Sequence, residues 1–94
     1  MQVTWTPEAT RHLHEIQQHI AANSPRYAQI MVDRFTARSM QLSLFPLSGT
    51  VVSEYHDSNV REVIEGLYRV IYRVEDEQVQ VLAVIHGARM LPPL

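Results

Sequence analysis

The sequence predicts an α+β fold with the element order β-α-α-β-β-β, in which an N-terminal helical hairpin packs on one face of an antiparallel sheet. Apolar residues recur at helical spacing over residues 7–43, whereas residues 60–86 alternate and are rich in β-branched and aromatic side chains. Pro46 and Gly49 separate the two regions. The length of 94 residues predicts one domain, residues 1–94, with one modest core.

The N-terminal half contains two helix starts of the same kind. Residues 2–5 alternate polar and apolar side chains, which favours a short strand, and Thr6-Pro7 then begins a helix that we expect to end near Ala22. Ser24-Pro25 repeats this pattern and begins a helix that reaches about Ser43, so the short connection predicts an antiparallel hairpin. The expected core stripes are Ala9, Leu13, Ile16 and Ile20, and then Ala28, Met31 or Val32, Phe35, Ser39 and Leu42.

The C-terminal half is predicted to form consecutive strands. Residues 50–59 are expected to form a loop with at most a short strand, and strands follow over residues 60–65, 67–74 and 78–86. Gly66 and the polar stretch 75–77 provide short connections, which favour an antiparallel meander. Trp5, Tyr68 and Tyr72 are expected in the core, the two tyrosines with hydroxyls at its rim.

The composition limits the chemistry that the chain can perform. It contains no cysteine, which excludes disulfides, thiolate metal sites and cysteine nucleophiles. No apolar run approaches the roughly 18–20 residues of a membrane span, and residues 1–8 lack the features of a signal peptide, so we expect a cytoplasmic protein. The formal net charge is −2, with eight arginines and no lysine, and we expect no direct nucleic-acid binding by the chain alone.

One helical face invites comparison with a metal site. His12, Glu15 and His19 lie at positions i, i+3 and i+7 of the first predicted helix. Helical zinc motifs place two ligands one turn apart and add a third from elsewhere, which this spacing does not match. We therefore interpret the three residues as a solvated face and expect neither a metal nor a cofactor.

Several motifs, in the same order along nearly the whole chain, resemble the RelE/ParE toxin superfamily. They are Trp5 with Pro7 and Ala9, Ser24-Pro25, Phe45-Pro46-Leu47-Ser48-Gly49, Val60-Arg61-Glu62-Val63, Leu67-Tyr68-Arg69-Val70-Ile71-Tyr72-Arg73 and His86-Gly87-Ala88-Arg89. The last two are the most specific. The resemblance implies the toxin of a type II toxin–antitoxin pair, which a ParD-like or similar antitoxin neutralises in a hetero-oligomeric complex.

The resemblance leaves two branches that differ in their target. RelE-like members cleave messenger RNA on the ribosome with sites built largely from lysines and arginines, and with a tyrosine or histidine near the C-terminus. ParE-like members inhibit DNA gyrase and are not known to catalyse a reaction. This chain has no lysine, and residues 87–94 contain no tyrosine. These departures favour the ParE-like branch, without a catalytic residue.

Two alternatives remain open. A RelE-like ribonuclease would need Arg61, Arg73, His86 and Arg89 to converge, with Glu54 or Glu62 as base. A domain without toxicity would serve only as antitoxin partner or corepressor. On the preferred interpretation, the residues that contact antitoxin or target are Arg61, Arg69, Arg73, Arg89, Met90, Leu91, Phe45 and Leu47. Structural roles compete with these assignments, since Arg69 and Arg73 can pair with acids such as Glu62 or Glu65, and His86 can be a hydrogen-bonded structural residue.

Overall fold

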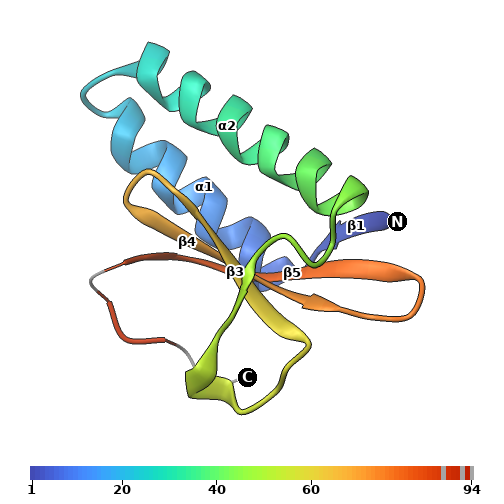
Figure 1. Cartoon of the computed structure of the whole chain (residues 1–94). Coiled ribbons are helices and arrows are strands. Elements are labelled where there is room, and N and C mark those ends of the chain that lie inside the picture. The colour runs from blue at the N-terminus through green and yellow to red at the C-terminus, as the bar shows by residue number, and fades with distance from the viewer. Residues whose placement is uncertain (88, 92, 94) are drawn as a thin grey trace.

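The helical hairpin lies on one face of a five-stranded sheet in the computed structural model, which describes residues 1–87, 89–91 and 93 (Figure 1). The strand order is β1-β5-β4-β3-β2. The predicted element order is confirmed, with two short additions between α2 and β3. The elements are β1 (Gln2–Trp5), α1 (Pro7–Ala21), α2 (Pro25–Leu44), β2 (Thr50–Val51), the 3₁₀ helix η1 (Ser53–Tyr55), β3 (Val60–Glu65), β4 (Tyr68–Val74) and β5 (Gln78–His86).

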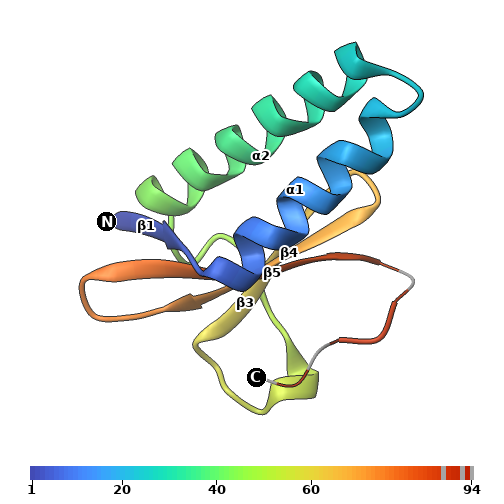
Figure 2. The ribbon, with the colours of Figure 1, turned by 180° about the vertical axis from the view of Figure 1, so that it is seen from behind.

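Both helices begin at the predicted caps. The Thr6 hydroxyl accepts a hydrogen bond from the Ala9 amide at 3.0 Å, and the Ser24 hydroxyl accepts one from the Tyr27 amide at 3.2 Å. Each helix has proline in its first turn, where a missing amide proton costs nothing. Viewed from behind in Figure 2, α1 and α2 run side by side, and α1 packs against β5. Neither described helix combines the length and the apolar character needed to cross a membrane.

The sheet is antiparallel except at one edge. β3, β4 and β5 form the predicted meander, and β2 adds to β3. β1 instead pairs in parallel with β5, from Gln2 opposite Gln78 to Trp5 opposite Val81. The strand predicted over residues 67–74 was expected to begin at Leu67, but β4 begins at Tyr68. Gly66, with φ +59°, and Leu67 instead form the two-residue turn of a hairpin.

Both faces of the sheet bury apolar side chains. Under the helices, Phe35 and Leu42 of α2 pack with Val70, Tyr72 and Val81 of the sheet. On the opposite face a smaller cluster joins Val52, Val60, Ile71 and Ala83, covered in part by Tyr55, Ile85 and Leu91. Residues 70–72 of β4 are all buried, as expected for a strand that is covered on both sides. Residues outside the helices therefore have to cover the second face.

Tyr72 connects the sheet to the segment that follows α2. Its side chain is fully buried, and its hydroxyl donates to the Pro46 carbonyl at 2.9 Å and accepts from the Gly49 amide at 2.9 Å. A Cβ atom on residue 49 would overlap the Glu62 carbonyl oxygen and lie 2.6 Å from the tyrosine oxygen. Only glycine fits here. The hydroxyl was expected at the rim of the core, but it is enclosed by this segment.

We expect Tyr72→Phe to lower the free energy of unfolding by about 1–3 kcal/mol, because the buried Gly49 amide and Pro46 carbonyl both lose their partner. Urea denaturation followed by circular dichroism measures the change. Tyr27→Phe, at a tyrosine that is 45% exposed on α2, is the matched control and should change stability by less than about 0.5 kcal/mol. Equal effects of the two substitutions would contradict the assigned role of Tyr72.

Alkaline pH should act through the same residue. Burial raises the pKa of Tyr72, and the Gly49 amide and Arg61 offset this only in part. A raised folded-state pKa means that Tyr72 contributes stability below pH of about 10, which is lost as pH rises through the folded-state value. Burial also raises the pKa of Tyr55, which acts in the same direction. Tyr72→Phe should therefore reduce the fall in stability above pH of about 10 without abolishing it, as measured by urea denaturation over a pH series.

Candidate functional site

The sheet face opposite the helices carries a cluster of arginines and carboxylates. Arg69 of β4 donates through Nε to Oε2 of Glu62 in β3 at 2.6 Å, and its Nη2 lies 2.5 Å from the same oxygen. Both side chains are only about one-sixth exposed, at 16% and 17%. Nη2 also lies 3.8 Å from the Glu54 carboxylate of η1. Two acids therefore compensate the charge of Arg69, which leaves it poorly suited to stabilise a phosphate.

Arg73 lies at the other end of the same face. Its Nε is 3.8 Å from the Asp57 carboxylate, and both side chains are more than one-third exposed. Such an exposed pair contributes little stability. The pairing of Arg69 with Glu62 is the structural alternative expected from the sequence, whereas Arg73 pairs with Asp57, which the sequence did not single out.

Arg61 has a different role, beneath the segment that follows α2. Its Nη1 donates to the Gly49 carbonyl at 2.9 Å and to the Leu47 carbonyl at 3.4 Å. Together with the Tyr72 hydroxyl, Arg61 fixes the backbone of residues 46–49. Any contact of Arg61 with a partner is thus through the segment that it holds.

His86 lies on the helix side of the sheet, away from Arg69 and Arg73. Its ring packs edge-to-face on Tyr68, with centroids 5.7 Å apart, and it lines a cavity against α1. In β4, Tyr68 is opposite His86, whereas Arg73 is opposite Gln80 near the far end of β5. Because side chains alternate between faces, Arg69 and Arg73 project from the face opposite to Tyr68 and Tyr72. The structure does not bring Arg61, Arg73, His86 and Arg89 together.

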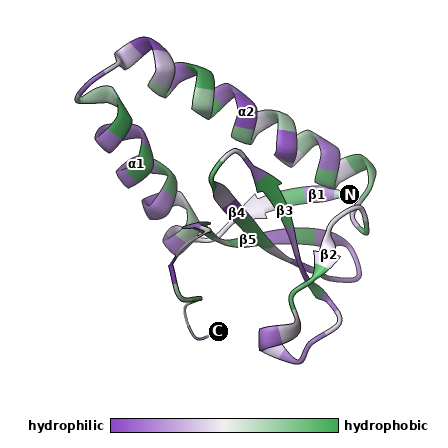
Figure 3. Ribbon diagram, turned by 60° about the vertical axis from the view of Figure 1, so that its left-hand side comes forward, coloured by the Kyte–Doolittle hydropathy of each residue, from purple (hydrophilic) through white to green (hydrophobic). Residues whose placement is uncertain are grey.

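The segment from the end of α2 to β2 exposes large apolar side chains, and we call Met40, Leu44, Phe45, Leu47 and Val51 the apolar segment. Their exposed fractions run from 45% at Val51 to 71% at Leu44, and Figure 3 shows this hydrophobic stretch where α2 ends. Exposed apolar clusters on small proteins often mark sites of protein contact. Phe45 and Leu47 were expected contacts. Met40 and Leu44 were missed, although they stand off the core stripe of the second helix.

The predicted contact residues that follow β5 lie in different surroundings. Met90 is 94% exposed, whereas Leu91 packs on the second core cluster. The Arg89 amide donates to the His86 carbonyl at 2.9 Å, which places Arg89 next to the end of β5. Arg89 is therefore near His86, as the ribonuclease alternative required, but Arg73 is not.

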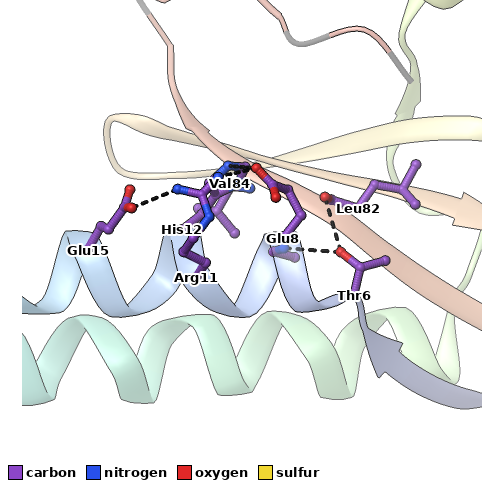
Figure 4. Close-up of polar contacts among 8 residues, drawn as sticks. Thr6, Glu8, Arg11, His12, Glu15, Leu82 and Val84 are labelled. Carbon is purple, nitrogen blue, oxygen red and sulfur yellow. Dashed lines mark hydrogen bonds and ion pairs between the residues drawn. The ribbon is translucent and has the colours of Figure 1, made fainter.

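A cavity of about 520 Å³ lies between α1 and the C-terminal half of β5, and we call it the α1–β5 cavity. Its rim includes Arg11, Glu15, His19 and Arg89. Arg11 pairs with Glu8 and with Glu15, the latter at 2.7 Å (Figure 4). Both carboxylates are paired with Arg11, so neither Glu8 nor Glu15 is placed to accept a proton as a general base. The sequence predicted a solvated face for His12, Glu15 and His19 and no cavity there; Glu15 and His19 are exposed, but the prediction is wrong for His12, whose side chain is only 13% exposed.

His12 closes the inner end of this cavity. Its Nδ1 accepts a hydrogen bond from the Val84 amide at 3.2 Å, and its Nε2 lies 3.4 Å from the Glu8 carboxylate (Figure 4). The hydrogen bond from the Val84 amide fixes the orientation of the His12 ring, because Nδ1 has to point its lone pair at that amide. Among the residues that the structure describes, no group of three or more histidines and acids could hold a metal ion.

Substitutions of Arg69 and Arg73 compare the close, largely buried ion pair of Arg69 with the longer, exposed ion pair of Arg73. We expect Arg69→Gln to lower the free energy of unfolding by about 1–3 kcal/mol, because Glu62 loses its partner in a largely buried position. The exposed Arg73→Gln should cost less than about 0.5 kcal/mol. Chemical denaturation measures both values. Glu62→Gln should remove most of the additional effect of Arg69→Gln in a double-mutant cycle, and strict additivity would contradict the direct pairing.

Comparison with known proteins agrees with this architecture. The family model described as the ParE toxin of type II toxin–antitoxin system, parDE, matches residues 3–91. The fold is similar to a chain of the chromosomal ParDE system from P. aeruginosa, with a TM-score of 0.75 and 20% identity over 92% of this chain and 95% of that chain. It is also similar to a chain of the toxin–antitoxin complex RelBE2 from Mycobacterium tuberculosis, with a TM-score of 0.62 and 28% identity over 90% and 95%. No curated protein matches the chain. The family match spans nearly every residue, so the chain belongs to the ParE toxin family and is the toxin of a type II toxin–antitoxin system.

Proposed function

We propose that this toxin acts by docking onto DNA gyrase in the cytoplasm, without catalysis of its own, and that a ParD-like antitoxin neutralises it by binding. The observation that carries the proposal is the apolar segment, whose five large side chains are 45–71% exposed. A soluble protein of this size gains nothing from exposing them unless a partner covers them. Gyrase is the target expected for the ParE-like branch.

The arrangement of charged groups supports docking over RNA cleavage. Cleavage without a metal needs a base, an acid and cations that stabilise the extra charge on phosphate. Here Arg69 is compensated by Glu62 and Glu54 on one face, and His86 lies on the other. Arg11 and Arg89 line the α1–β5 cavity with His86, and Arg11 is held by Glu8 and Glu15. Arg61 and Arg73 lie away from His86, so the cations that cleavage requires are not gathered in one place.

An antitoxin partner is supported by the similar structures, whose descriptions name a ParDE system and a RelBE2 toxin–antitoxin complex. An antitoxin segment that covers Phe45 and Leu47 would mask the same surface that we assign to gyrase. Met90 offers a further apolar contact, whereas Leu91 would have to leave the second core cluster to take part. Neutralisation would then result from competition for one surface.

A supercoiling assay with purified gyrase tests the target. We expect the antitoxin-free toxin to inhibit supercoiling in a dose-dependent manner. Phe45→Asp and Leu47→Asp should each weaken inhibition at least about tenfold, because a carboxylate replaces an apolar anchor at the interface. Leu67→Asp is the matched control, because Leu67 is at least as exposed, at 71% against 63% for Phe45 and Leu47, but lies at the β3–β4 turn.

The outcomes separate the candidate functions. Full gyrase activity at saturating wild-type toxin would reject gyrase as the target. New cuts in messenger RNA, mapped in a translation reaction, would instead favour the ribonuclease alternative. Inhibition that Leu67→Asp weakens as much as Phe45→Asp would reject the apolar segment as the docking site. Harmless expression of the chain without an antitoxin would favour the non-toxic alternative.

A further inference from the structure

The α1–β5 cavity combines an apolar floor with a polar rim. Ile16 of α1 and Val84 of β5 line its interior beside the ring of Tyr68. Arg89 and His19, both exposed, lie at its rim. A volume of about 520 Å³ falls within the roughly 300–1,000 Å³ of typical ligand pockets. The cavity is therefore large enough for a short peptide segment with one or two side chains inserted.

One cation at the rim is open to an anion. Arg11 is engaged by Glu8 and Glu15, and these three exposed groups together carry a formal charge of −1, so Arg11 does not attract an anion. Arg89, by contrast, makes no ion pair with any carboxylate in the described part of the chain. Imidazoles at the same rim can donate N–H hydrogen bonds. An incoming carboxylate would gain a charge-assisted contact with Arg89 without displacing an internal acid.

The backbone of β5 decides how an occupant can bind. β1 pairs with β5 only as far as Val81, and the open edge beyond it is covered by side chains of α1 and its cap. Thr6 donates through its hydroxyl to the Leu82 carbonyl at 3.3 Å, and the Val84 amide donates to His12 (Figure 4). Because these groups are already satisfied, a partner cannot extend the sheet as a new strand at Leu82–Val84. It has to insert side chains.

We propose that the α1–β5 cavity receives a glutamate or aspartate carboxylate, with a neighbouring apolar side chain, from an acidic segment of the antitoxin. The carboxylate contacts Arg89, and the apolar side chain packs on Ile16 and Tyr68. This site is separate from the apolar segment, so the antitoxin holds the toxin at two places. The identity of the partner rests on the proposed function, whereas the chemistry of the site does not.

Nuclear magnetic resonance of the histidine side chains tests the site in the whole chain. The probe is the peptide acetyl-Glu-Leu-Glu-amide, and its matched neutral control is acetyl-Gln-Leu-Gln-amide. We expect the acidic peptide to shift the His12, His19 and His86 signals saturably, because all three line the cavity. His14 and His56 lie outside the cavity lining and should not respond. Equal shifts with the two peptides would overturn the proposal, as would shifts confined to His14 or His56.

Variants that remove one arginine charge provide a second test of the site. Arg89→Gln should weaken binding of the acidic peptide at least about fivefold, whereas Arg34→Gln, at an exposed arginine of α2, should leave it unchanged. Equal losses in the two variants would indicate general charge attraction and would refute a built site. Saturation by inorganic phosphate without any response to the peptide would also refute a peptide site. None of these readouts uses gyrase, so failure of gyrase inhibition would leave this result intact.

Discussion

The sheet has two apolar faces, and the described residues of this 94-residue chain form one helical hairpin, which covers one of the faces. β4 and β5 run through the middle of the sheet and bury residues on both sides. The hairpin covers one side, so the other depends on Val52, Tyr55 and Leu91. Ion pairs from Arg69 to Glu54 and from Arg73 to Asp57, both at 3.8 Å, lie over the same face but add little stability. The apolar contacts of Val52, Tyr55 and Leu91 therefore do most to cover this side of the sheet.

The same constraint explains why apolar side chains remain exposed where α2 ends. The chain must leave the helix layer there and reach the far edge of the sheet within a few residues. Tyr72 and Arg61 bind the backbone at Pro46, Leu47 and Gly49, so that backbone is held from below while Phe45 and Leu47 remain exposed. A segment fixed in this way loses little conformational entropy when a partner binds. Its exposure and its rigidity therefore have one cause, the attachment to the sheet.

Local signals in the sequence were sufficient for most of the fold. Caps at Thr6 and Ser24 and the apolar stripes predicted the hairpin, because each depends only on neighbours along the chain. The parallel pairing of β1 with β5 joins residues more than 70 positions apart, and no local pattern encodes that partner. The candidate site was harder because β5 contains an irregularity: Ile71 is opposite Ala83 but Tyr72 is opposite Val81. That one extra residue puts Gln80 and His86 on opposite faces, although their spacing predicts the same face.

The charge distribution bears on how such a scaffold can act. Arg11, Arg38, Arg69 and Arg73 each face a carboxylate of the same chain, and Arg61 donates to backbone carbonyls. An arginine compensated in this way can orient a loop, but it offers little to the developing charge of a phosphate transition state. Protein docking has no such requirement, since apolar anchors supply most of the energy and charges mainly set specificity. These five arginines hold the toxin's own structure, which leaves recognition to the apolar segment and, through Arg89, to the rim of the α1–β5 cavity.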